Sequence, residues 1–254
     1  MLDQLLPNDV FSLLLVFARI GSAVMLLPGF GEVFVPARAR LGIALALSLI
    51  VAPVVSQTLP VLPQNLVRLF LVLGGEVGIG LFIGAMARAM LSALHVAGVV
   101  IGFQTSLSNA QFFDPTNAQQ GVLIAAFMNI LGILLIFTAD LHHLMLAGLV
   151  DSYSVFRPGD MIPLGDISDA AVRVVGRSFD LGLQIAAPFV VVGFVFYVGL
   201  GLLSRLMPQI QVFFIAVPLQ LALGFLVMAL TLSAGMLWFL DGFQTAINSL
   251  LRRS

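Results

Sequence analysis

The sequence predicts an all-α protein that crosses a membrane several times. Of its 254 residues, 60% are hydrophobic and only 9% are charged, and the mean hydropathy is +1.13. Soluble domains contain about 45–50% apolar and about 25% charged residues. The apolar runs follow one another without a soluble insert, so the chain is expected to form one domain over residues 1–254.

Six apolar segments are expected to supply the helices, because a membrane helix needs about 20 mostly apolar residues. They cover residues 10–30, 41–55, 66–103, 122–150, 179–203 and 212–240. Glycines and prolines lie inside these segments, which neighbouring helices can tolerate by satisfying the backbone groups that proline frees. The pattern therefore predicts kinked helical hairpins, with the hydrophilic stretch 151–169 as a connection.

Two of the segments are too long for one straight span. The segment 66–103 is expected to bend or to form two helices near its glycines, which are residues 74, 75, 78, 80 and 84. The segment 122–150 is also overlong, and it carries Asp140, His142 and His143.

Composition excludes several classes of function. The chain has no cysteine, which rules out disulfides and thiolate chemistry. Its net charge of −1 argues against a nucleic-acid partner. The first ten residues hold two aspartates and no basic residue, so we predict no cleavable signal peptide. We find no P-loop, nucleophile elbow or zinc-protease helix, and we predict neither enzymatic activity nor a cofactor.

Three ionisable residues lie inside apolar segments, namely Arg19, Glu76 and Arg88. We predict that they form structural ion pairs, either with another helix or with a neighbouring subunit, because a buried charge needs a partner. The alternative is a secondary transporter in which Glu76, Arg88 or His143 relays protons. Such transporters often contain paired repeats, and the sequence shows no convincing repeat.

The only cluster of carboxylate and histidine is Asp140-Leu-His-His143. Asp140 and His143 are three residues apart and share a helix face, which suits a structural role at a helix end. The alternative is an intramembrane metalloenzyme that uses His95, His142 and His143. We predict no metal site here.

A polar stretch, SNAQFFDPTNAQQG over residues 108–121, separates two apolar segments. It contains asparagines and glutamines but no basic residue, so it offers hydrogen bonds with little fixed charge. Its composition alone predicts an exposed connecting loop with a turn at Asp114-Pro115. Phe112 and Phe113 are also suited to a hydrophobic constriction, which is one way in which pores are gated.

The order of several motifs resembles the FliR family of the type III export apparatus. The resemblance covers nearly the whole chain and rests on these stretches: FARIGSAVMLLPGFGEVFVPARARLGIALALSLIVAP, EVGIGLFIGAMARAM, AGVVIGFQTSLSNAQFFDP, TADLHHLMLAGLVDSYSVFRPGD and RLMPQIQVFFIAVPLQLALGF. Its sharpest parts are the Phe-Asp-Pro turn at residues 113–115 and the series Pro208-Gln209, Val212-Phe213 and Pro218-Leu219. Gln220 stands where the family often has a basic residue.

This resemblance implies a subunit of a helical, conical export channel. FliR-like proteins join FliP-like and FliQ-like subunits, with FlhB-like and FlhA-like proteins around them. The resemblance further implies a place in the bacterial inner membrane within the flagellar basal body. The assembled gate would project toward the periplasm and pass unfolded export substrates.

The resemblance also implies that a loop over about residues 104–119 plugs the closed channel. Eight residues are expected to form this plug or gate: Gln104, Ser106, Asn109, Gln111, Phe112, Phe113, Asp114 and Pro115.

Overall fold

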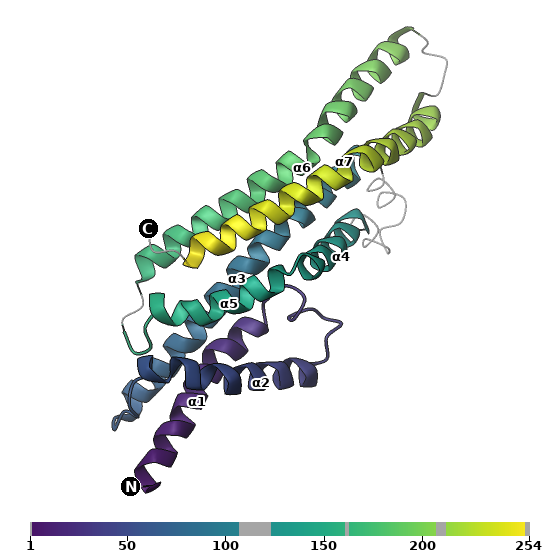
Figure 1. Cartoon of the computed structure of the whole chain (residues 1–254). Helices are drawn as coiled ribbons and strands as arrows, with labels where there is room; N and C mark the ends of the chain where they lie inside the picture. Colours follow the sequence, from purple (N-terminus) through teal and green to yellow (C-terminus); the bar gives the residue numbers. More distant parts are fainter. Residues whose placement is uncertain (1, 107–122, 161–162, 207–211, 252–254) are drawn as a thin grey trace. The chain divides into compact units, whose positions relative to one another are not determined.

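The computed structural model describes residues 2–106, 123–160, 163–206 and 212–251. In this part of the chain every regular element is a helix (Figure 1). The elements are α1 (Leu2–Val24), α2 (Ala37–Val55), η1 (Ser56–Thr58), α3 (Leu66–Gln104), α4 (Leu123–Thr138), α5 (Leu141–Val155), α6 (Leu164–Leu206) and α7 (Val212–Leu251). The chain is thus an all-α polytopic membrane protein, as its composition predicts.

Fewer helices than expected qualify as membrane spans. Among the described residues, α2 with η1, α3, α6 and α7 are long and apolar enough to cross a membrane. The pair α4 and α5 adds a fifth if it counts as one bent span. The expected first span corresponds to α1, which is not among these candidates and which carries Asp3, Asp9 and Arg19.

Of the two alternatives expected for residues 66–103, a bend or a division into two helices, the division is wrong, because α3 is one uninterrupted helix of 39 residues. Two of its glycines, Gly80 and Gly84, serve close packing instead. A Cβ atom at Gly80 would overlap the backbone oxygen of Arg19, and one at Gly84 would lie 2.8 Å from the backbone oxygen of Ala23. Two small residues four apart let two helix backbones approach closely, here α3 and α1.

The other overlong segment does divide. Between α4 and α5 the chain bends by 75°. The break lies at Asp140, whose φ of 57° and ψ of 15° are left-handed. Aspartate tolerates this conformation better than most residues, because its short polar side chain can bond locally.

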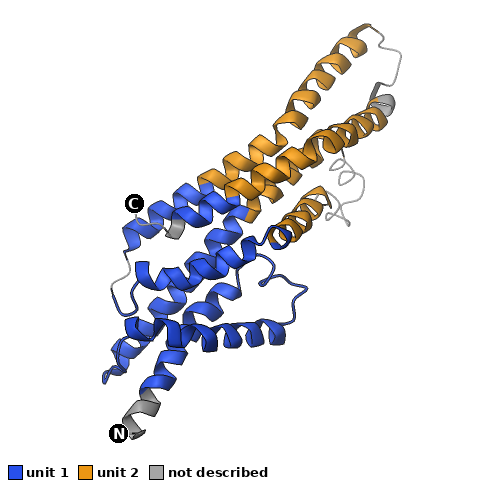
Figure 2. Ribbon diagram, viewed as in Figure 1, with its two compact units in different colours: residues 1–90, 137–175, 243–254 blue, residues 91–136, 176–242 orange. Residues whose placement is uncertain are grey.

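The described chain divides into two compact units, which Figure 2 colours separately. Unit 1 comprises residues 1–90, 137–175 and 243–254, and unit 2 comprises residues 91–136 and 176–242. The unit boundaries fall within α3, α4, α6 and α7, so each of these helices supplies residues to both units.

The core of unit 1 is made by α1, α2, α3 and α5. Its buried side chains include Ile20, Ala44, Ile83 and Leu149. In α2 the buried positions are Ala44, Ser48, Val51 and Val55. This spacing of three and four residues places one stripe of the helix against its neighbours.

The core of unit 2 is made by α3, α4, α6 and α7. Helices α6 and α7 run side by side, with Ile185 near Gly235 and Leu181 near Gly242 (Figure 1). A Cβ atom at Gly98 of α3 would overlap the backbone of Ala125 in α4. Small residues thus permit tight helix contacts in this unit as well.

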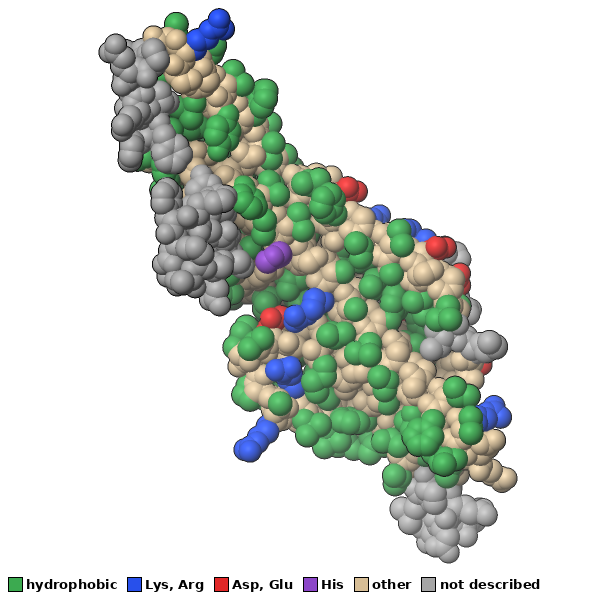
Figure 3. All heavy atoms as spheres, turned by 180° about the vertical axis from the view of Figure 1, so that it is seen from behind, with side chains coloured by type: hydrophobic (Ala, Val, Ile, Leu, Met, Phe, Trp, Pro, Cys, Tyr) green, Lys and Arg blue, Asp and Glu red, His purple; other side chains and the backbone are tan. Residues whose placement is uncertain are grey.

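Much of the apolar surface stays exposed. In an apolar stretch of 18 residues from each of the four candidate spans, only 22–28% of the residues are buried within the chain. Hydrophobic side chains cover much of the face seen in Figure 3, where charged groups are few. The exposed set includes Phe70, Phe194, Leu230 and Trp238, each more than half exposed. Such a surface needs lipid or another apolar partner.

Candidate functional site

The segment 107–122, between α3 and α4, contains most of the predicted plug. Asn109, Gln111, Phe112, Phe113, Asp114 and Pro115 lie outside the described residues. The structure does place Gln104, which is the last residue of α3, and Ser106, which lies in the turn that follows it. Residues 104–106, which lead into this segment, are therefore the described part of the predicted plug.

A buried glutamine holds the end of α3 in unit 2. The side-chain nitrogen of Gln220 in α7 donates a hydrogen bond to the backbone oxygen of Gln104 (2.6 Å). The same nitrogen donates a second one to the hydroxyl of Tyr197 in α6 (3.0 Å). The hydroxyl of Ser106 donates to the side-chain oxygen of Gln220 (2.6 Å). One amide therefore connects three helices through uncharged groups.

Residues 105 and 106 are fixed in this place by burial and conformation. Thr105 is 2% exposed and Ser106 is 6% exposed. The hydroxyl of Thr105 donates to the backbone oxygens of Ile101 (2.9 Å) and Gly102 (3.3 Å). Ser106 has a left-handed φ of 59°, which stops the helix.

A second polar centre lies in unit 1 around Arg19, which is fully buried. Its Nε donates to Glu76 Oε2 at 2.7 Å, and one terminal nitrogen donates to Glu76 Oε1 at 3.0 Å. This fork geometry is the strongest form of arginine–carboxylate pairing. The predicted residues Arg19 and Glu76 therefore pair with each other, within one chain.

The rest of the guanidinium is also satisfied. It donates to the hydroxyl of Ser152 (3.1 Å) and to the backbone oxygen of Phe156 (2.8 Å). Its central carbon lies 4.0 Å from the ring centre of Tyr153, which is a cation–π distance. Arg19 thus joins α1 to α3, to α5 and to the residue that follows α5.

Arg88, the third predicted residue, has a separate partner. It forms an ion pair with Glu32 at 2.8 Å and donates to the backbone oxygens of Leu26 (3.0 Å) and Gly31 (3.4 Å). Its side chain is 42% exposed. These contacts fasten the connection between α1 and α2 to α3.

A cavity of about 510 Å³ opens beside Glu76 in unit 1. Its wall includes Arg68, Arg157 and Asp160 in addition to apolar side chains. Glu76 is only 1% exposed, because its carboxylate is directed at Arg19.

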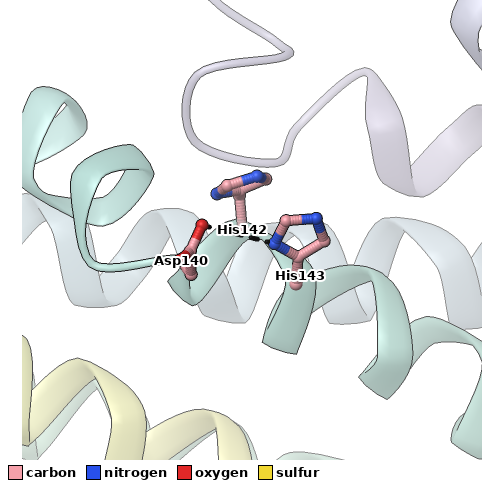
Figure 4. Close-up of side chains that lie close together, drawn as sticks. All are labelled: Asp140, His142 and His143. Atoms are coloured by element: carbon pink, nitrogen blue, oxygen red, sulfur yellow. Dashed lines mark ion pairs between the residues drawn. The ribbon is translucent and has the colours of Figure 1, made fainter.

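The third polar cluster is Asp140, His142 and His143 at the bend before α5 (Figure 4). Their candidate ligand atoms all lie within 4.8 Å of one another, and Asp140 Oδ1 is 3.6 Å from His143 Nδ1. The side chains of Asp140 and His143 are 79% and 72% exposed, and the ring of His142 stacks on Phe137. His95, the third histidine of the metalloenzyme alternative, belongs to unit 2.

Several of these residues were not singled out from the sequence. Ser152, Tyr153 and Glu32 carried no signal beyond being polar near apolar segments. Gln220 did carry one, since it is a glutamine inside an apolar helix and directly follows Pro218-Leu219. Its partners are 114 and 116 residues away in sequence, so only the fold reveals them.

Comparison with known proteins identifies the family. The model for "Bacterial export proteins, family 1" matches residues 10–246. The flagellar biosynthetic protein FliR of Caulobacter vibrioides is 42% identical over 231 residues, which are 91% of this chain and 92% of that protein. The protein of the same name from Bacillus subtilis is 30% identical over 89% of this chain and 88% of its own length.

A protein named for the translocation of Yop proteins is similar as well. The Yop proteins translocation protein T of Yersinia pestis is 25% identical over 91% of this chain and 89% of its own length. The match to the family model covers more than half of the chain, and the flagellar relatives cover nearly all of it. This chain therefore belongs to the family 1 bacterial export proteins, the FliR family of the type III export apparatus.

Proposed function

We propose that this chain is a channel-forming, non-enzymatic subunit of the flagellar type III protein export gate. In this role it passes unfolded substrates across the inner membrane. Membership of the export family supports the transport role. The observation that carries the channel role is the polar stretch 108–121, which has no basic residue and lies between two apolar helices.

The plug of the closed pore is formed by residues 104–119 in this proposal. Phe112 and Phe113 supply the apolar seal. The asparagines and glutamines around them provide hydrogen bonds but no cation to hold the acidic groups of a passing chain. The hydrogen bonds of Gln104 and Ser106 with Gln220 of α7 support a fixed starting point for this plug.

The chain functions here within a larger assembly. The exposed apolar surface is suited to packing against FliP-like and FliQ-like subunits, with FlhB-like and FlhA-like proteins beyond them. The assembled gate lies in the inner membrane at the flagellar basal body and projects toward the periplasm.

Deleting residues 107–116 tests the plug. We expect the assembled gate to leak small monovalent ions, because the seal is gone while Ser106 and its contacts remain. The measurement is the flux of such an ion across membranes that contain the assembled complex. A sharper variant replaces Phe112 and Phe113 by alanine. Its matched control is Gln120→Ala, because Gln120 lies in the same polar segment but beyond the proposed plug.

An unchanged ion flux in the deletion variant, with normal amounts of assembled gate, would rule out the plug. A leak in the Gln120→Ala control equal to that of the Phe112→Ala/Phe113→Ala variant would remove the specific role of the two phenylalanines.

The second candidate function is a secondary transporter with a proton relay at Glu76. The cavity beside Glu76 favours it, because the charged side chains of Arg68, Arg157 and Asp160 in its largely apolar wall would bind water. The two-point pairing of the carboxylate with Arg19 favours the structural role instead. Replacement of Glu76 by Gln separates the two. A relay predicts intact assembly with loss of proton-coupled transport, whereas the structural role predicts weaker assembly.

A further inference from the structure

Two arginines border the cavity beside Glu76 in unit 1. Arg68 lies in the first turn of α3, and Arg157 lies in the connection between α5 and α6. Among the described residues, neither guanidinium forms an ion pair with a carboxylate. The wall also contains Asp160, whereas the charge of Glu76 is compensated by Arg19. Two positive charges therefore stand against one negative charge around this cavity.

A tight turn, Arg157-Pro158-Gly159-Asp160, places two of these charges. The backbone nitrogen of Asp160 donates to the backbone oxygen of Arg157 at 3.2 Å, and Pro158 is buried. Gly159 has a left-handed φ of 89°, which glycine adopts without a steric penalty. A Cβ atom at Gly159 would lie 3.7 Å from the ring of Pro60, so the turn lies beside the chain that leads into α3. The backbone of this turn thus fixes where Arg157 and Asp160 begin.

The rest of the wall is mainly apolar and continues onto the surface of the chain. Its apolar side chains are Leu71, Val72, Ile79 and Leu164. Leu71 is 70% exposed and Leu164 is 73% exposed, so the apolar wall is open to a surrounding membrane. Arg68 is the third residue of α3, a candidate span, and arginines near the ends of such helices reach the lipid headgroups. The volume of about 510 Å³ is typical of a ligand site.

We propose that this cavity binds the headgroup of an anionic phospholipid. Arg68 and Arg157 bind the phosphate, because the planar guanidinium matches two phosphate oxygens, and one acyl chain lies along the apolar wall. Basic pockets between membrane helices bind anionic headgroups in this way. The excess positive charge favours a lipid with a net negative charge, such as phosphatidylglycerol, over zwitterionic phosphatidylethanolamine. Asp160 accepts a hydrogen bond from a headgroup hydroxyl. The inference does not depend on the proposed export role.

Four substitutions test the site. Arg68→Gln and Arg157→Gln each remove one cation from the cavity. Asp160→Asn removes a negative charge and keeps a hydrogen-bond acceptor, so it should strengthen the binding of an anionic lipid. Arg173→Gln is the matched control, because Arg173 is an exposed arginine of α6 in the same unit and does not line the cavity. Thermal unfolding in detergent verifies that each variant is folded.

The measurement is photochemical labelling by a lipid probe. The full chain, with any subunits that purify with it, is placed in phosphatidylcholine vesicles that contain a small fraction of photoreactive phosphatidylglycerol. Mass spectrometry then locates the labelled residues of this chain. We expect wild-type labelling at the cavity wall and roughly fivefold less of it in Arg68→Gln and in Arg157→Gln, since one arginine near a membrane surface contributes about that factor. Labelling should rise in Asp160→Asn and stay unchanged in Arg173→Gln.

Competition identifies the class of ligand. Unlabelled phosphatidylglycerol should displace the probe from the cavity. The same amount of phosphatidylethanolamine should displace much less, because its headgroup carries no net charge. Inorganic phosphate in the buffer should not displace the probe, because it lacks the acyl chain that the apolar wall binds.

Several results would overturn the inference. Wild-type labelling in Arg68→Gln or in Arg157→Gln would show that the two arginines do not bind the phosphate together. An equal loss in Arg173→Gln would mean that any surface arginine has this effect. Equal competition by phosphatidylethanolamine would show that headgroup charge is not recognised, and displacement by inorganic phosphate would indicate a site for a soluble anion. No labelling of the wild-type cavity would mean that another occupant, such as an acidic segment of a partner protein, fills it. If Arg68→Gln does not fold, Arg157→Gln and Asp160→Asn decide the question.

Discussion

Arg19 joins several buried groups of unit 1. It is fully buried, and it contacts Glu76, Ser152, Phe156 and Tyr153. Removing one member of a buried pair leaves the other charge without compensation, which typically costs roughly 3–5 kcal/mol. The more exposed pair of Arg88 and Glu32 should contribute much less, because solvent screens it.

A comparison of two glutamate variants follows from this difference. We expect Glu76→Gln to lower the free energy of unfolding of the purified complex several times more than Glu32→Gln does. The Glu32→Gln substitution should cost at most about 1 kcal/mol. The measurement is the thermal unfolding of each complex in detergent. Equal stability of Glu76→Gln and wild type would mean that the Arg19 pair does not stabilise the fold.

The double variant Arg19→Met/Glu76→Leu provides a further check. A buried ion pair can often be replaced by apolar residues of similar volume with little loss. We expect the double variant to be more stable than Glu76→Gln alone. The opposite order would show that the guanidinium contributes mainly through Ser152 and Phe156.

At the scale of elements, the glycines of α3 divide into two classes. Gly80 and Gly84 lie against the backbone of α1, whereas a Cβ atom at Gly74 or Gly78 would meet open space. The first pair sets how closely α3 and α1 can approach. The second pair is exposed, so it leaves surface on α3 for lipid or another subunit.

Alanine substitutions within one helix test this division. We expect Gly80→Ala to destabilise the protein by about 1–3 kcal/mol, because the added methyl group would force α1 away from α3. Gly74→Ala is the matched control and should be neutral or slightly stabilising, since alanine favours helix over glycine. Thermal unfolding of the two variants in detergent gives the comparison. Equal effects would contradict close packing at Gly80.

At the scale of the whole chain, exposed apolar surface is the dominant feature. In the 18-residue apolar stretch of each candidate span, 28% or less of the residues are buried within the chain. An isolated membrane protein can cover such a surface with lipid, whereas a subunit covers part of it with its partners.

Co-purification distinguishes these cases. We expect this chain, when produced together with FliP-like and FliQ-like subunits from the same cell, to elute with them in one complex of fixed stoichiometry. Produced alone, it should give lower yield and aggregate in detergent, because its partner surfaces stay uncovered. A stable homogeneous species that forms without partners and ignores them when they are present would favour the transporter.

Periodicity and composition determined the class of this protein. Hydropathy located the apolar segments, because burial in lipid demands long apolar helices with internally satisfied backbones. The order of motifs predicted the family, which the comparisons confirm. The sequence also indicated that Arg19, Glu76 and Arg88 need partners, since charges inside apolar helices are costly.

Only the tertiary structure decided which partners these are. Arg19 meets Glu76 over a separation of 57 residues, and Gln220 meets Ser106 over 114 residues. Hydropathy could not tell whether the glycines of α3 interrupt the helix or allow a neighbouring helix to approach, because both roles require the same residue type. The continuous α3 and the 75° bend at Asp140 depend on which helices lie nearby. The polar groups at the end of α3 likewise have a partner that only the fold brings to them, which is Gln220.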